Sequence, residues 1–158
     1  MYGIYKGKKY RVAKISTFYR VISGEKAEGF EEYIDILGEK RPDIFVKDVD
    51  IHELDYLYEV KYEFLYRGHY FRALSTMIRK LIDKDYFEIS AGIEKYDLIE
   101  KLGFKRLDES TWWKDIRRKD IEALKIVEEP LGIFKDQGLK IKILEGKAID
   151  EFLASVKD

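Results

Sequence analysis

The chain of 158 residues contains no cysteine, only two prolines and only two histidines. Without cysteine it can form neither disulfides nor thiolate metal sites, and a cysteine nucleophile is excluded. No apolar run approaches the roughly 20 residues that a membrane-spanning helix needs, and the N-terminus has no basic stretch followed by an apolar one. We therefore expect a cytoplasmic protein that does not associate with membranes.

Motifs for catalysis and for ligand binding are also scarce. His52 and His69 have no further histidine nearby in the sequence that would complete a zinc ligand set. The chain contains neither a glycine-rich phosphate-binding loop nor the Gly-x-Ser-x-Gly motif of serine hydrolases. Acidic pairs are plentiful, but nothing fixes the separation that acid–base catalysis requires. We expect a protein that is not an enzyme and that needs no metal, cofactor or small-molecule ligand.

Charged residues make up 39% of the chain and hydrophobic residues 46%, which is typical of a globular protein. The charges are unevenly distributed. Residues 1–15 carry five cations and no acid, whereas residues 16–60 carry twelve acids and five cations. Residues 61–84 hold six cations and two acids, and residues 85–129 hold nine cations and twelve acids. This pattern indicates either complementary packing within the protein or a face that meets a charged partner.

Short blocks of sequence recur in the same order in the two halves of the chain. The pairs are residues 5–11 (YKGKKYR) with 66–72 (YRGHYFR), 19–23 (YRVIS) with 86–90 (YFEIS), 37–41 (LGEKR) with 102–106 (LGFKR), and 47–49 (KDV) with 114–116 (KDI). The offsets of 61, 67, 65 and 67 residues leave room for small insertions only. We therefore predict a tandem duplication, with module 1 over residues 1–61, module 2 over 62–130 and a C-terminal extension over 131–158. Each module alone would have a marginal core, so we expect the two to pack as one unit.

Each module is predicted to be strand, strand, strand, helix, strand, helix. In module 1 the predicted strands are residues 2–6, 10–16, 18–23 and 44–49, and the helices are residues 25–37 and 51–60. In module 2 the strands are residues 62–66, 69–82, 86–89 and 107–116, and the helices are residues 93–102 and 119–128. Asp50 and Glu53 have the spacing of a capping box. A further strand over 139–144 and a helix over 148–156 are predicted in the extension. Antiparallel sheets with helices on one face define an α+β fold.

Two other functions have partial support. Residues 96–105 (YDLIEKLGFK) resemble the closing segment of acyl-CoA-dependent N-acetyltransferases, although the pyrophosphate-binding turn of that family is missing. Residues 5–11 alternate cations with aromatic rings, as nucleic-acid binding requires. Aromatic pairs across a hairpin explain the same pattern, and the acidic remainder of each module would repel phosphates. Nucleic-acid binding, or a generic protein interaction through these hairpins, is the main alternative function.

The repeated pattern resembles small immunity proteins that accompany polymorphic toxins in Gram-positive bacteria. Residues 1–7 (MYGIYKG) and 100–104 (EKLGF) carry most of this resemblance, which covers roughly residues 2–129. The resemblance implies a cytoplasmic protein that binds the C-terminal domain of one cognate toxin and blocks its active site or substrate access. Many such toxins are nucleases with basic clefts.

An acidic cluster in module 1 is the best candidate for contact with such a toxin. Carboxylates give electrostatic steering toward a basic cleft, and tyrosine is a frequent anchor residue. The candidate residues are Asp48, Asp50, Glu53, Asp55, Tyr56 and Glu59. An ordinary solvated helix face would explain the same cluster. Module 2 has a mixed set of charges at the corresponding positions, so only the first copy is expected to bind.

Overall fold

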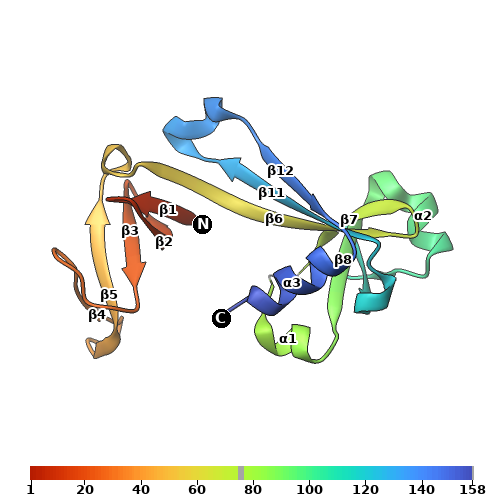
Figure 1. The fold of residues 1–158 in the computed structure, drawn as a ribbon, viewed down its shortest axis with the longest axis horizontal. Coiled ribbons are helices and arrows are strands. Elements are labelled where there is room, and N and C mark those ends of the chain that lie inside the picture. Colours follow the sequence, from red (N-terminus) through yellow and green to blue (C-terminus); the bar gives the residue numbers. More distant parts are fainter. Residues whose placement is uncertain (75–76, 158) are drawn as a thin grey trace. The chain divides into compact units, whose positions relative to one another are not determined.

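The chain forms two compact units in a computed structural model that describes residues 1–74 and 77–157. Unit 1 comprises Met1–Val60 and Glu128–Leu139, and unit 2 comprises Lys61–Val127 and Lys140–Asp158. Two long strands, β6 (Tyr56–Tyr66) and β11 (Ala123–Pro130), have a part in each unit. Figure 1 labels the elements of both units along the ribbon.

Unit 1 is built from antiparallel strands in the hydrogen-bonded order β4-β5-β3-β2-β1-β6. Its strands besides β6 are β1 (Tyr2–Tyr5), β2 (Lys8–Ile15), β3 (Phe18–Ser23), β4 (Glu31–Ile34) and β5 (Lys40–Val49). The 3₁₀ turn η1 (Ile51–Glu53) connects β5 to β6, and a second one, η4 (Gly132–Gln137), follows β11. Its core is formed by Tyr5, Val12, Val21, Phe30, Val49, Leu54 and Leu57.

Local sequence explains the start of unit 1. Lys6 and Gly7 both have positive φ, at 49° and 79°, as the tight two-residue turn of a β-hairpin requires. The predicted hairpin is thereby confirmed. Gly3 lies where β1 packs closely on its neighbours, because a Cβ atom there would come within 2.8 Å of the Val12 side chain.

Unit 2 has the strand order β6-β7-β8-β10-β9, and β11 pairs with β6 and β12. Its strands besides β6 and β11 are β7 (His69–Ala73), β8 (Phe87–Gly92), β9 (Lys105–Arg106), β10 (Thr111–Ile116) and β12 (Lys140–Leu144). Its helices are α1 (Arg79–Asp83), α2 (Tyr96–Lys101) and α3 (Lys147–Ser155), with 3₁₀ turns η2 (Ile93–Lys95) and η3 (Arg118–Asp120).

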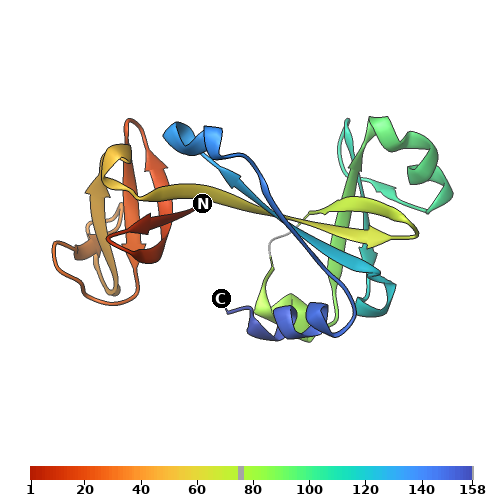
Figure 2. The ribbon, with the colours of Figure 1, turned by 45° about the horizontal axis from the view of Figure 1, so that its top comes forward.

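Helix α3 completes the core of unit 2. Its Ile149 is fully buried and its Leu153 is 5% exposed, and both belong to the same apolar cluster as Phe64 and Phe71. Arg79 of α1 donates to the carbonyl oxygen of Leu153 at 2.7 Å, and Figures 1 and 2 show α1 and α3 side by side. Arg118 binds the carboxylate of Asp150 through two hydrogen bonds of 2.7 and 3.2 Å. The C-terminal segment is thus an integral part of unit 2.

Two predicted helices are strands. Residues 51–60 form the single turn η1 and then the first part of β6. Residues 119–128 comprise the end of η3 and most of β11. The apolar spacing 51, 54, 57 and 60 suggested a helix, but β6 as a whole (YLYEVKYEFLY) is rich in tyrosine and also contains valine and phenylalanine, which favour strands. Neighbours such as Leu57 and Tyr58 are both buried, as in a strand covered on both faces.

The predicted helix over residues 25–37 is also wrong, because this range contains turns and the strand β4. Gly29 has a φ of 82°, which interrupts a helix there. The predicted strand over residues 69–82 is shorter, since β7 ends at Ala73 and α1 begins at Arg79. Residues 75–76 of that range lie outside the described residues.

Other predicted elements are confirmed. Residues 93–102 contain η2 and α2, and the extension contains β12 and α3. The capping box of η1 is present, with the Glu53 carboxylate accepting from the Asp50 N–H at 2.7 Å. The protein therefore has an α+β fold in which antiparallel strands dominate and the helices are short.

Candidate partner-binding surface

The predicted acidic cluster lies on the connection from β5 through η1 into β6. Asp48, at the end of β5, accepts two hydrogen bonds from the guanidinium of Arg20, at 2.7 and 3.0 Å. This hydrogen bonding lowers the pKa of the Asp48 carboxyl and raises that of Arg20. The charge of Asp48 is thus largely compensated within unit 1, so Asp48 contributes little to the field that a partner would meet.

Three further carboxylates of the cluster hold the backbone. Asp50 accepts from the N–H of His52 at 2.9 Å, and the Glu53 carboxylate accepts from the N–H of Asp50. Together these two hydrogen bonds cap η1. Asp55 accepts from the N–H of Gly7 at 3.2 Å and thereby ties the first hairpin to the start of β6. These three side chains are exposed, but each has a structural role that a substitution would disturb.

Tyr56 and Glu59 lie on β6 itself and are both half-buried. The hydroxyl of Tyr56 donates to Glu128 at 3.2 Å, and its ring stacks on Tyr58 and meets Phe134 edge to face. Tyr56 is thus packed against β6 and η4 rather than free to act as an anchor. The role of the six predicted residues in partner binding remains a prediction, with their structural roles beside it.

Unit 1 has further exposed acidic residues outside this cluster. Of the twelve acidic residues between positions 16 and 60, all but Asp35 and Glu59 are exposed. Only three of the five cations in that range are exposed, namely Lys26, Lys40 and Arg41. Over the whole chain, unit 1 holds 15 acidic and 11 basic residues, whereas unit 2 holds 16 and 19. Unit 1 therefore carries a net negative charge and unit 2 a net positive one.

The hairpin between β4 and β5 is a surface feature that the sequence analysis missed. Three apolar side chains on it are exposed to solvent: Ile34 by 55%, Ile36 by 97% and Leu37 by 80%. The helix predicted over residues 25–37 left no place for a hairpin here. The motif Asp-Ile-Leu-Gly at residues 35–38 was the available signal, because aspartate followed three residues later by glycine is typical of a turn.

Comparison with known proteins gives a family but no function. Residues 1–131 match the model of a family described as "Uncharacterised conserved protein UCP033725". The chain belongs to this family. No curated protein and no solved structure matches it.

The match to the UCP033725 family ends directly after β11. Both units nevertheless use residues that follow. Phe134 of η4 packs against the core of unit 1, and Leu144, Ile149 and Leu153 join the core of unit 2. The C-terminal segment of this family member therefore stabilises both units.

The hairpins that suggested nucleic-acid binding do not offer aromatic faces at their tips. Tyr5 and Tyr66 stand at corresponding places in the two hairpins, and they are only 5% and 7% exposed. Lys9 lies over the rings of Tyr2 and Tyr58, with its ammonium group 4.6 Å from the centre of the Tyr2 ring. Stacking of bases on Tyr5 or Tyr66 would require the hairpins to open, which weakens this alternative.

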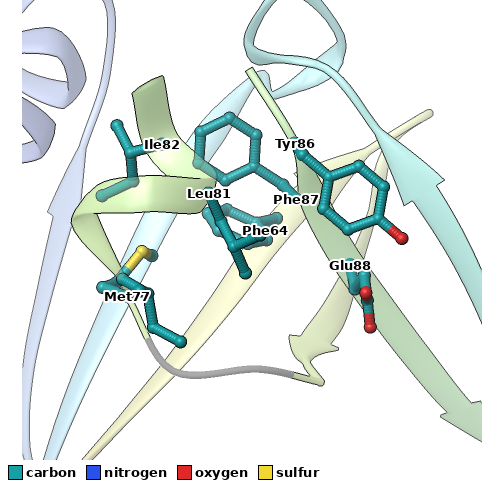
Figure 3. Close-up of a pocket in the computed structure, with 8 residues that line it drawn as sticks. Phe64, Met77, Leu81, Ile82, Tyr86, Phe87 and Glu88 are labelled. Atoms are coloured by element: carbon teal, nitrogen blue, oxygen red, sulfur yellow. The ribbon is translucent and has the colours of Figure 1, made fainter. Parts of the chain in front are cut away.

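A small cavity lies in unit 2 between α1 and strands β6 and β8 (Figure 3). The lining residues are Phe64, Met77, Ile78, Leu81, Ile82, Tyr86, Phe87 and Glu88. Its volume of about 10 Å³ holds at most a single water molecule. At its rim a hydrogen bond with Glu88 raises the pKa of Tyr86. This cavity is too small for an organic ligand.

Within the described residues, no group of three histidine, aspartate or glutamate side chains is placed to hold a metal ion. No helix in the described part of the chain has the length and apolar character needed to span a bilayer.

Proposed function

We propose that this member of the UCP033725 family is a non-catalytic, cytoplasmic immunity protein that binds the C-terminal domain of a cognate bacterial toxin and occludes its active site. The proposal combines the resemblance of residues 1–7 and 100–104 to immunity proteins with the character of the surface of unit 1. Its partner is a protein with a basic cleft, such as a nuclease domain.

The exposed acidic surface of unit 1 is the observation that carries this proposal. Between residues 16 and 60 ten carboxylates are exposed, Asp48 with its Arg20 partner among them, whereas only three cations in that range are exposed. A surface of this kind attracts a basic partner over distances of about a Debye length and raises the rate of association. Nuclease clefts are basic because they bind phosphates, so a carboxylate-rich protein surface can occupy them in place of the substrate.

We also infer that the two units are tandem copies of one module. In each unit a lysine of one strand is the pairing partner of a fully buried residue on the neighbouring strand. Lys47 pairs with Val21, and Lys114 pairs with Ile89. The N–H of Gly7 binds the side chain of Asp55, and the N–H of Gly68 binds that of Glu122 in the same way. In each case a 3₁₀ turn precedes the last strand.

The correspondence is supported by the aromatic residues as well. Gly29 and Gly103 both have positive φ; Gly29 is followed by the core residue Phe30, and Gly103 by Phe104, which packs against the core of unit 2. Phe30 packs on Tyr10 with ring centres 5.5 Å apart, and Phe104 packs on Phe71 at 5.0 Å. The shared module is thus a set of antiparallel strands with one 3₁₀ turn, while the surface charges of the copies have diverged.

Reversing two charges on the acidic surface is expected to slow binding. Glu31 and Glu32 on β4 are exposed, and within the described structure their side chains make no hydrogen bond or ion pair. In the Glu31→Lys/Glu32→Lys variant, the association rate with the purified, catalytically inactive toxin domain should fall about tenfold at low salt, because the steering field is weakened. Surface plasmon resonance at several salt concentrations measures this effect.

The matched control is Glu100→Lys/Glu151→Lys, which makes the same change in net charge at two exposed acidic residues of unit 2. This control should associate at a rate within about twofold of wild type, since unit 2 is not the acidic unit. Equal association rates for all three proteins would show that the acidic surface of unit 1 does not guide binding. If wild type itself fails to bind the domain, the proposed function is wrong.

A further inference from the structure

We propose that Ile36 and Leu37, at the tip of the β4–β5 hairpin, form the apolar anchor that inserts into a pocket of the toxin domain. This inference rests on the proposed function and names the contact residues and the chemistry of the partner surface. The pocket is apolar inside and basic at its rim.

One aspartate makes several hydrogen bonds within the hairpin tip. The carboxylate of Asp35 accepts from the N–H groups of Leu37 and Glu39, at 2.9 and 3.0 Å, and from the guanidinium of Arg41 at 3.2 Å. Backbone hydrogen bonds of 2.9 Å link Gly38 to Asp35 and Asp35 to Glu39. Gly38 supplies the positive φ of 82° that closes the turn. The tip is therefore ordered before any partner arrives, which reduces the entropy lost on binding.

The two side chains at the tip point into solvent. Ile36 is 97% exposed and Leu37 is 80% exposed, which are the largest exposures of any large apolar side chains in the described structure. Asp35 between β4 and these residues is only 12% exposed, so the polar group is used inside the turn while the apolar groups are presented. An ordered turn that presents adjacent aliphatic side chains is suited to filling a pocket of a partner.

The charges around the tip identify the rim of that pocket. Residues 31–43 contain five carboxylates and two cations. One of these cations, Arg41, is already paired with Asp35. A partner that buries Ile36 and Leu37 must therefore accommodate Glu31, Glu32 and Glu39 at its edge, which favours lysine or arginine there. A second copy of this chain is a poor occupant, because two such acidic tips would repel one another.

Other exposed apolar residues do not have these properties. Ile141 and Ile143 on β12 are 57% and 52% exposed, but Lys140 and Lys142 alternate with them. Lysines on an outer strand are a common protection against pairing with other chains. In unit 2 the corresponding hairpin between β9 and β10 presents one aliphatic residue, Leu107, at 51% exposure. The β4–β5 tip is the stronger candidate for an anchor.

The Ile36→Ser/Leu37→Ser variant tests the anchor. Binding of the catalytically inactive C-terminal domain of the toxin encoded beside this chain is measured by surface plasmon resonance. The Kd should rise about 100-fold, mainly through faster dissociation, because anchor residues act on the lifetime of a complex. Thermal unfolding of the variant should match wild type, since both side chains are exposed. The control Ile93→Ser removes an aliphatic side chain that is 62% exposed in unit 2, and it should bind within about twofold of wild type.

The outcomes are distinguishable. If wild type binds and the double variant binds within about threefold of it, the anchor is overturned while the proposed function stands. If neither wild type nor Ile93→Ser binds, the proposed function is overturned and the anchor with it. An equal loss in the double variant and in Ile93→Ser would also overturn the assignment, because the effect would not be specific to the hairpin.

Discussion

Replacing both Ile149 and Leu153 with alanine is expected to lower the free energy of unfolding by about 5 kcal/mol. Both side chains are buried in the core of unit 2, at 0% and 5% exposure, and each loses several methyl and methylene groups in the variant. A loss of this size is comparable to the total stability of many domains of this length. Urea denaturation followed by circular dichroism measures the change.

The control for this variant is Glu151→Ala, an exposed position on the same helix. It should change the free energy of unfolding by no more than about 0.5 kcal/mol. The result bears on the role of the C-terminal segment, which lies outside the region matched to the family. A loss below about 1.5 kcal/mol in the double variant would mean that α3 is not part of the core.

The Phe71→Ala variant is expected to lose about 4 kcal/mol of stability. Phe71 is fully buried on β7, and its ring contacts those of Phe104 and Tyr66 at centre distances of 5.0 and 6.4 Å. Removing it leaves a cavity lined by rings that cannot move far. Thermal and urea unfolding both report the loss.

Two controls separate this effect from changes to the strand. His69→Ala alters an exposed residue of the same strand and should be nearly neutral. Tyr10→Ala removes the residue of unit 1 that packs on Phe30 as Phe71 packs on Phe104. Because Tyr10 is only half-buried, its loss should be about 2 kcal/mol. A neutral Phe71→Ala variant would contradict the described packing of unit 2.

The parts of the fold that were predicted correctly depend on neighbours in the sequence. Lys6-Gly7 and Arg67-Gly68 form the expected hairpin turns, and all four residues have positive φ. The Asp50–Glu53 capping box and the helix of residues 96–101 are also set by local spacing. Such features need no information about distant strands, so the sequence alone was sufficient for them.

Two of the three wrong helices, those over residues 51–60 and 119–128, show the limit of periodicity. In β6 the buried residues Leu57 and Tyr58 are adjacent, because the strand is covered on both faces in unit 1. A strand of this kind lacks strict alternation, and a spacing of three residues then arises within it by chance. The helix predicted over residues 119–128 is wrong for the same reason, since the neighbouring residues Ala123 and Leu124 are both buried.

If the two units are copies of one module, as proposed, the strand pairings favour an alignment of the copies that differs in places from the one read from the sequence. The sequence match set Val21 against Glu88, whereas the strand pairings set Val21 against Ile89. It likewise set Gly38 against Gly103, whereas Gly29 has the same place before a core phenylalanine. In strands a shift of one residue exchanges the buried and exposed faces, so the pairing partners are needed to fix the register.

For the candidate binding site, the sequence alone predicted the negative charge but not the arrangement of the side chains. The pairing of Asp48 with Arg20 and of Asp55 with Gly7 joins residues 28 and 48 positions apart, which no local pattern reveals. The exposed hairpin of Ile36 and Leu37 was hidden by the wrong helix assignment. Composition indicated an acidic surface, and the structure was needed to separate carboxylates with internal partners from those that face solvent.

Survival of cells that co-express this chain with the active toxin domain encoded beside it tests the central claim most directly. Under the proposed function, wild type should restore growth to the level given by a catalytically inactive toxin, because each toxin molecule would be blocked by one bound copy of this chain. The Ile36→Ser/Leu37→Ser variant, expressed at the same level, should protect far less. Cell death in the presence of folded, well-expressed wild-type protein would contradict the claim that this chain neutralises a toxin.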